Sequence, residues 1–391
     1  MLTIISLIFS YVYFNIDVTE KKVLAIPSIL FIILYALSFD LQSWHDLTNI
    51  TFLFTRPHFA FENYILFGGT LLSFAIAIAS VDYVKVKVRK NKMVYSISKM
   101  RKLYYIFSFF SLCAFIINML RVFRGGGIEL MFIAPRAYEY LFGDSFIINY
   151  IYFLNVPALC LFVYLKHNGE KLSGGFILNI LLVLISFFHG IKFTIFDTIL
   201  YPTCFYYMLK DRVSLKPLIY ISLILLGVFS LFSIFVRGGD DKSPLLSIAS
   251  YIFPNFYNLA YSIEVEPIQF GHITPLFLPD KFFDPTTEIT IGNPVSGFVL
   301  NDSYNMYTVL HTLFSAFNFM GPLFFIPLFI LQYIAYKRRN DSIIYLFLAT
   351  YMFFCMLFYF YFYAYMKFKN VYYVLVFCLI HSLCKKRTNI I

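Results

Sequence analysis

Apolar blocks of about 15 to 25 residues recur along the whole chain, and a helix needs roughly 20 such residues to cross a membrane core of roughly 30 Å. The chain has 391 residues, of which 60% are hydrophobic and only 13% are charged. A soluble domain carries roughly 25% charged residues. These features exclude a soluble globular enzyme, a secreted enzyme, a single-span anchor and a nucleic-acid-binding domain.

We therefore expect an all-α fold, a polytopic integral membrane bundle of about eleven transmembrane helices that forms a single transmembrane domain over residues 1–391. The spans are predicted at residues 2–16, 23–39, 63–83, 103–120, 145–165, 173–189, 193–209, 217–236, 315–336, 342–366 and 370–384. The six cysteines lie in or beside apolar blocks and form no CxxC pair, which favours neither a disulfide framework nor a zinc site.

The basic residues predict the orientation of the chain, because Lys and Arg in short loops stay on the cytoplasmic side. The segment 84–102 is rich in Lys and Arg, and we assign it to the cytoplasm. Following the spans from there puts further basic residues on the same side: Lys21, Lys22, Lys166, Lys171, Lys210, Arg212, Lys216, Lys337, Arg338, Arg339, Lys385, Lys386 and Arg387. The N-terminus is then outside and the C-terminus is cytoplasmic. The net charge of +10 mostly reflects this topology and not nucleic-acid or lipid binding.

Three longer connections fall on the outer side, at residues 40–62, 121–144 and 237–303. Loops on a rigid scaffold are where binding and catalytic residues gather. Within the large extracytoplasmic loop, the apolar run 245–263 is interrupted by Pro254, Asn255 and Asn258. We predict a helix there that lies at the membrane interface or re-enters from outside.

Arginines cluster in these outer connections. Arg121 and Arg124 are three residues apart, on one face of a helix that the run 125–127 of three glycines would end. Arg136 follows in the same connection, and Arg237 ends the eighth predicted span. Guanidinium groups suit phosphate oxygens, so these residues are candidates to bind a membrane-anchored diphosphate. Alternatively, each arginine snorkels to the interface or pairs with an acidic neighbour: Glu129, Glu139 or Asp240.

A polar stripe precedes the ninth predicted span, and its members are Tyr304, Thr308, His311, Ser315 and Asn318. Spacings of four and three place them on one face of a helix, which Asp302 or Ser303 would cap. Gly321-Pro322 is expected to kink this helix. The stripe either lines a site or makes hydrogen bonds between helices.

Three residues are candidates for a general acid or base, His272, His311 and Asp241. His189, Lys192 and Asp197, near the outer turn between the sixth and seventh spans, are weaker candidates, since a Lys-Asp pair would explain them. The chain has no phosphate-binding Gly-rich loop, HExxH run or GxSxG elbow. We expect no cofactor, no metal and no cytosolic nucleotide donor.

Two short runs carry a resemblance: Asn305-Met306-Tyr307-Thr308 and Phe317-Asn318-Phe319-Met320-Gly321-Pro322-Leu323. They resemble the N-x-Y-T run and the D-F-G-x-x-G-like stretch of the oligosaccharide repeat-unit polymerases, the O-antigen polymerase (Wzy) family. Asn318 stands where that family usually has Asp. The chain length, the number of spans and the one dominant late outer loop are also similar to that family.

The resemblance implies a GT-C-like glycosyltransferase of the bacterial inner membrane. Its substrates would be undecaprenyl-diphosphate-linked oligosaccharides, which it would join outside the cytoplasm into O-antigen, capsule or exopolysaccharide. Membrane lipids, and a chain-length regulator protein, would be its partners, with no role for nucleic acid. A flippase or other transporter of lipid-linked oligosaccharides, and an O-antigen ligase-type membrane transferase, are the alternatives.

The implied reaction is an inverting attack by a sugar hydroxyl on the anomeric carbon beside the diphosphate, without a metal. Arg237 and Arg124 are assigned to the diphosphate, with Arg121 and Arg136 as second choices. The base would be His272, His311 or Asp241. The remaining substrate-binding candidates are Tyr304, Asn305, Tyr307 and Thr308.

Overall fold

The computed structural model describes most of the chain. The described residues are 2–4, 6–7, 19–48, 61–89, 93–189, 192–210, 227, 252–253, 255–260, 263, 273–279, 308–360 and 364–386. Among them the regular structure is helical, with one isolated bridge between Tyr95 and Lys385 and no strand. The chain divides into two compact units. The first unit is Met1–Lys87, Ala249–Lys337 and Tyr351–Val371, and the second is Val88–Ile248, Arg338–Thr350 and Tyr372–Ile391.

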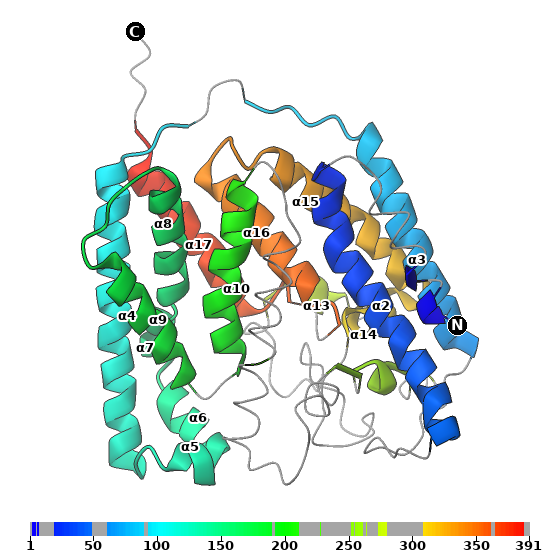
Figure 1. Ribbon diagram of the computed structural model, residues 1–391, viewed down its shortest axis with the longest axis horizontal. Helices are drawn as coiled ribbons and strands as arrows, with labels where there is room; N and C mark the ends of the chain where they lie inside the picture. The colour runs from blue at the N-terminus through cyan, green and yellow to red at the C-terminus, as the bar shows by residue number, and fades with distance from the viewer. Residues whose placement is uncertain are drawn as a thin grey trace. The chain divides into compact units, whose positions relative to one another are not determined.

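The second unit is built around the long helix α4. Its other helices follow in chain order: α5 (Leu130–Ile133), α6 (Pro135–Gly143), α7 (Phe146–Tyr152), α8 (Asn155–His167), α9 (Gly175–Phe187) and α10 (Lys192–Leu209). The first part of α16 (Ile343–Leu357) and most of α17 (Phe368–Cys384) complete it. Helix α4 (Ile97–Gly125) packs on α6, α7, α8 and α9, and α10 packs on α8 and α9 (Figure 1).

Several helix ends meet at the start of α4. The Tyr104 hydroxyl donates to the Gly175 carbonyl at the start of α9, over 3.2 Å. Arg101 pairs with Glu170, just after the end of α8. The Ser96 amide donates to the Cys384 carbonyl at the end of α17, over 2.8 Å. These contacts place the end of α8, the start of α9 and the end of α17 beside the start of α4.

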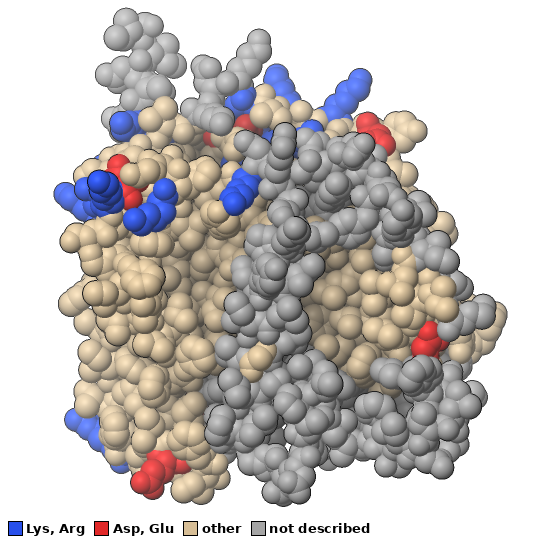
Figure 2. All heavy atoms as spheres, in the orientation of Figure 1, with Lys and Arg blue, Asp and Glu red and all other residues tan. Residues whose placement is uncertain are grey.

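Basic side chains collect at this end of the second unit. They are Arg89, Lys99, Arg101, Lys102, Lys166, Lys171, Lys210, Arg338, Arg339, Lys385 and Lys386. We call this the basic end. Figure 2 shows Lys and Arg around it, and a band of uncharged surface along α4 toward the opposite end. The structure thus brings together basic residues that the sequence assigned to one side, while the membrane side that they face stays a prediction.

The first unit has an aromatic core. Its main helices are α2 (Thr19–Thr48), α3 (Phe61–Ser80), α14 (Val309–Phe317), the 3-10 helix η3 (Asn318–Phe324) and α15 (Phe325–Lys337), with two short pieces, η1 (Val81–Tyr83) and α13 (Thr274–Phe277). The Phe31 ring of α2 lies 5.7 Å from the Phe256 ring and 6.1 Å from the Tyr359 ring, centroid to centroid. Phe256 and Tyr359 lie far from α2 in the sequence, so these ring contacts pack the three segments of the first unit together.

Four helices of the described part are long and apolar enough to cross a membrane: Phe61–Tyr83, Ile97–Gly125, Phe146–His167 and Val309–Lys337. Shorter apolar helices are Ala25–Asp40, Gly175–Phe187, Ile343–Leu357 and Phe368–Cys384. Exposed apolar side chains line α4, where Phe109 and Phe123 are 62% and 59% exposed. Large apolar groups in water are unfavourable, so this face suits hydrocarbon. The predicted spans 2–16 and 217–236 lie mostly outside the described residues.

The structure corrects several predicted boundaries. Helix α16 ends at Leu357, so 342–366 is not one helix. Beyond it, other groups use the backbone carbonyls: the Val309 amide donates to Tyr359 and the Asn255 side chain donates to Phe360. Such partners let a chain leave a helix within an apolar environment. The connection predicted at 40–62 is shorter, because α2 extends to Thr48. The connection predicted at 121–144 contains the end of α4 and the helices α5 and α6.

The interrupted run 245–263 is helical where it is described, at residues 252–253, 255–260 and 263. Residues 255–260 are all buried, and the Phe256 ring stacks on Tyr35 with centroids 5.0 Å apart. An interfacial helix would expose one face. Residues 255–260 therefore pack inside the first unit, and the re-entrant and interfacial alternatives stay predictions.

Candidate functional site

The candidate site in the second unit lies where α4 ends, opposite the basic end. Helix α4 stops at Gly125, and Gly126 caps it with φ 139° and with its amide on the Val122 carbonyl. A positive φ is costly for any residue with a Cβ, so glycine suits this position. The predicted end of the helix is therefore confirmed. It leaves Arg124 in the last turn, where the helix dipole favours cations, and Arg121 just before that turn. We call residues 121–124 the arginine turn.

Neither arginine is paired with an acid in the described part of the chain. Arg121 is half-buried and Arg124 is exposed, and among the described residues neither makes a hydrogen bond or an ion pair. The Nη1 atom of Arg121 is buried without a partner. A buried donor without a partner costs about 1–3 kcal/mol, and more when it is charged. The alternative in which Arg121 pairs with Glu129 or Glu139 is therefore not what the structure shows.

Helix α6 covers the end of α4. The buried Tyr138 hydroxyl donates to the Phe188 carbonyl and lies 3.8 Å from the Met119 sulfur. Because Met119 is two residues before Arg121, Tyr138 ties α6 to the arginine turn. Burial raises the pKa of Tyr138 to about 12, so this phenol stays neutral and can donate a proton in a hydrogen bond.

His189 follows Phe188 at this same end. Its imidazole is 1% exposed and lies among aromatic rings, with centroid distances of 5.0 Å to Phe142 and 5.6 Å to Phe153. The sequence offers His189 only as a weaker candidate site residue and does not single out Tyr138. The spacing of Tyr138 and Phe142, four apart in a run that begins with Pro135, is the signal that could have predicted a packed helix there.

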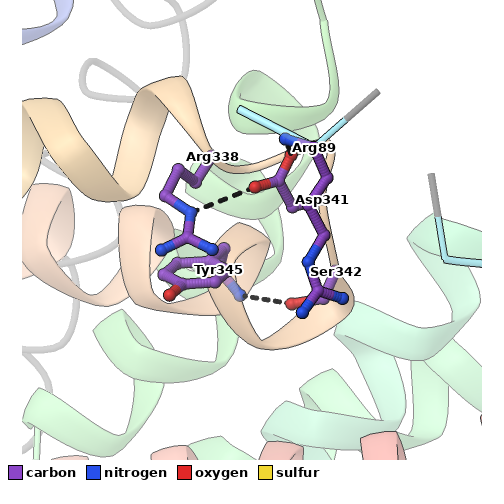
Figure 3. Close-up of polar contacts among 5 residues, drawn as sticks. All are labelled: Arg89, Arg338, Asp341, Ser342 and Tyr345. Carbon is purple, nitrogen blue, oxygen red and sulfur yellow. Dashed lines mark hydrogen bonds and ion pairs between the residues drawn. The ribbon is translucent and has the colours of Figure 1, made fainter. Parts of the chain in front are cut away.

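The basic end differs, because several of its cations have local partners. Arg338 donates from Nε to the Asp341 carboxylate over 3.0 Å, and its guanidinium lies 4.0 Å from the Tyr345 ring centroid (Figure 3). The Arg89 amide donates to the other Asp341 oxygen over 3.2 Å, and the Tyr345 amide donates to Ser342 (Figure 3). Asp341 thus joins the 84–96 segment to the loop before α16, which is a structural role.

In the first unit the structure places part of the polar stripe. Thr308 is the N-cap of α14, with ψ 166°, so the predicted helix does not run through it from Asp302 or Ser303. The reason is that the Val309 amide bonds the Tyr359 carbonyl instead of a preceding helical turn. His311 and Ser315 share a face of α14, and the Ser315 hydroxyl donates to the His311 carbonyl over 2.9 Å. The buried Thr308 hydroxyl has no partner among the described residues.

The chain turns sharply after α14. Asn318 has φ 56°, and its side chain accepts from the Phe319 amide over 2.8 Å. The α-helix is interrupted at Gly321-Pro322, as predicted, and the 3-10 helix η3 replaces it there. A Cβ on Gly321 would lie 2.7 Å from the Leu313 carbonyl oxygen, so only glycine allows η3 to pack this closely on α14.

Most of the other predicted site residues lie outside the described part of the chain: Arg237, Asp241, His272, Tyr304, Asn305 and Tyr307. Arg136 is the second residue of α6, and α5 separates it from Arg124 in the sequence. The structure therefore brings α6 to the arginine turn, and it describes Thr308 and His311 in the first unit. The described residues contain no group of three or more His, Cys, Asp or Glu that could hold a metal ion.

Long apolar helices, an uncharged band and a concentration of basic residues at one end are together the architecture of a helical membrane protein. Comparison with protein-family models, with curated proteins and with solved structures finds no match to this chain.

Proposed function

We propose that this chain is a membrane glycosyltransferase that polymerises undecaprenyl-diphosphate-linked oligosaccharide repeat units on the outer face of the bacterial inner membrane. The proposal combines the resemblance of residues 305–308 and 317–323 to the O-antigen polymerase family with the apolar helices. The product would be O-antigen, capsule or exopolysaccharide.

The strongest support for the proposal comes from the two arginines at the end of α4. At the end of α4 that lies away from the basic end, two arginines have no acidic partner among the described residues, and one of them has a buried, unpartnered nitrogen. A buried guanidinium nitrogen without a partner is costly, and an anionic ligand would supply the missing partner. A diphosphate on a membrane-anchored carrier has the charge and the depth to be that ligand.

The chemistry needs such a site. When the glycosidic bond to the diphosphate breaks, negative charge develops on the leaving oxygen. Guanidinium groups already in place would stabilise this charge in the transition state. The attacking sugar hydroxyl would lose its proton to a base, for which His272, His311 and Asp241 remain our candidates.

Surface-polysaccharide gels test this function in a strain that lacks the chain. We expect the ladder of polymer lengths to collapse to a single repeat unit on the lipid A core, with the ladder restored by the wild-type chain. Loss of a flippase or of a ligase would instead leave bare cores. Bare cores would contradict the proposal and support those alternatives, and an unchanged ladder would contradict all three.

A further inference from the structure

The connection between α4 and α7 presents an apolar surface that the fold leaves uncovered. In α5 and its end, Phe132 and Ile133 are 57% and 78% exposed, and in α6 Tyr140 is 72% exposed. The opposite face of α6 holds Tyr138 and Phe142, which are both fully buried. Helix α6 thus packs one side against α4 and leaves its other side open.

The helices that precede and follow this connection also expose apolar side chains. On α4 the exposed Leu120 and Phe123 lie just before the connection, and on α7 the exposed Phe146 and Ile147 lie just after it. Both neighbours belong to helices that are long and apolar enough to cross a membrane. Because the connection joins two such helices along the chain, we expect its open surface to meet the membrane as well.

Polar groups mark how deep this surface would lie. Arg124 and Glu129 are exposed before α5, and Asp144 is exposed after α6. Charged groups of this kind avoid hydrocarbon, while tyrosine rings concentrate at the membrane interface. The α5–α6 pair therefore has apolar side chains for the acyl region and charges at both ends for the headgroup region.

We propose that α5 and α6 lie in the membrane interface, with Ile133 and Tyr140 inserted among the lipid headgroups and upper acyl chains at the end of the second unit opposite the basic end. The partner is the lipid surface itself. The inference does not depend on the glycosyltransferase proposal, since any membrane protein with this surface would bind lipid in this way.

Fluorescence quenching by lipid tests the position of this surface. The chain contains a single tryptophan, Trp44. In a Trp44→Phe background, Ile133→Trp and Tyr140→Trp each place one fluorophore on the open face, and Phe142→Trp places one on the buried face as a control. Each purified full-length variant is reconstituted into phosphatidylcholine vesicles that contain lipid brominated near the headgroup end or near the tail end of its acyl chains.

We expect both open-face tryptophans to emit at short wavelength, to lose most fluorescence with the shallow bromine and less with the deep one, and to resist aqueous iodide. The Phe142→Trp control should respond little to any quencher. Emission at long wavelength with iodide quenching would show that water covers the surface and would overturn the proposal. Short-wavelength emission that no bromolipid quenches would also overturn it, because a protein surface, such as a second copy, would then cover the helices.

Discussion

At the scale of single residues, the turn after α14 needs a residue without a Cβ at position 321. Gly321 sits where a Cβ would meet the backbone of Leu313 and Phe314, at 2.7 Å and 3.0 Å. Backbone atoms cannot move aside as a flexible side chain can. Asn318 holds the other side of the turn with φ 56°, a conformation that Asn tolerates better than most residues. Gly321 therefore has a packing role in this turn.

Replacing Gly321 with alanine is expected to destabilise the protein by about 1–3 kcal/mol, the usual cost of forcing extra volume into a packed contact. The thermal unfolding midpoint in detergent measures this loss. Gly68→Ala is the matched control, because a Cβ there has nothing within 4 Å and alanine favours a helix. Equal midpoints for the two variants would show that η3 does not pack closely on α14.

The double variant Arg121→Ala/Arg124→Ala should lower polymer formation strongly while the protein level stays normal. Each hydrogen bond to a charged group contributes about 1.5–3 kcal/mol, which is about 10- to 100-fold in rate. Arg89→Ala removes an exposed arginine at the basic end and should leave the ladder intact. The gel ladder and an immunoblot of the membrane fraction are the measurements, and a normal ladder from the double variant would remove this turn from the site.

At the scale of elements, α6 is held to α4 and α9 through Tyr138, and this contact predicts a pH dependence. The folded pKa of about 12 exceeds the ordinary value of 10.0, so the neutral phenol stabilises the fold. This stability is complete below pH 10 and is lost as the pH rises toward 12. Unfolding midpoints across this range should fall less steeply for Tyr138→Phe than for the wild type. Parallel curves would contradict the role of this phenol.

The sequence predicted the helices better than the places where they break. Spans 103–120 and 193–209 correspond to α4 and α10, because continuous apolar runs can only become helices in a membrane. The end of α16 at Leu357 was missed because the aromatic run continues, while its turn depends on hydrogen bonds from Val309 and Asn255. The spacing of Arg121 and Arg124 before three glycines was enough to predict this helix end. Tyr138 and His189 come to it only through tertiary contacts, which the sequence does not show.

At the scale of the whole molecule, the basic end predicts which side of the membrane each end of the second unit faces. Single cysteines at two exposed positions, Glu129 and Lys171, report this in a cysteine-free background. A membrane-impermeant maleimide should label the Glu129→Cys variant in cells with a permeable outer layer and the Lys171→Cys variant only after the inner membrane is opened. The reverse pattern would place the arginine turn in the cytoplasm and contradict the proposed function.

The polymerase proposal is tested most directly by the purified chain in liposomes with undecaprenyl-diphosphate-linked repeat units. We predict that lipid-linked products of two or more repeat units form, with release of undecaprenyl diphosphate and without an added nucleotide or metal. The Arg121→Ala/Arg124→Ala protein should form them much more slowly. Repeat units that keep their length would contradict the account, whether they stay in place or cross the bilayer.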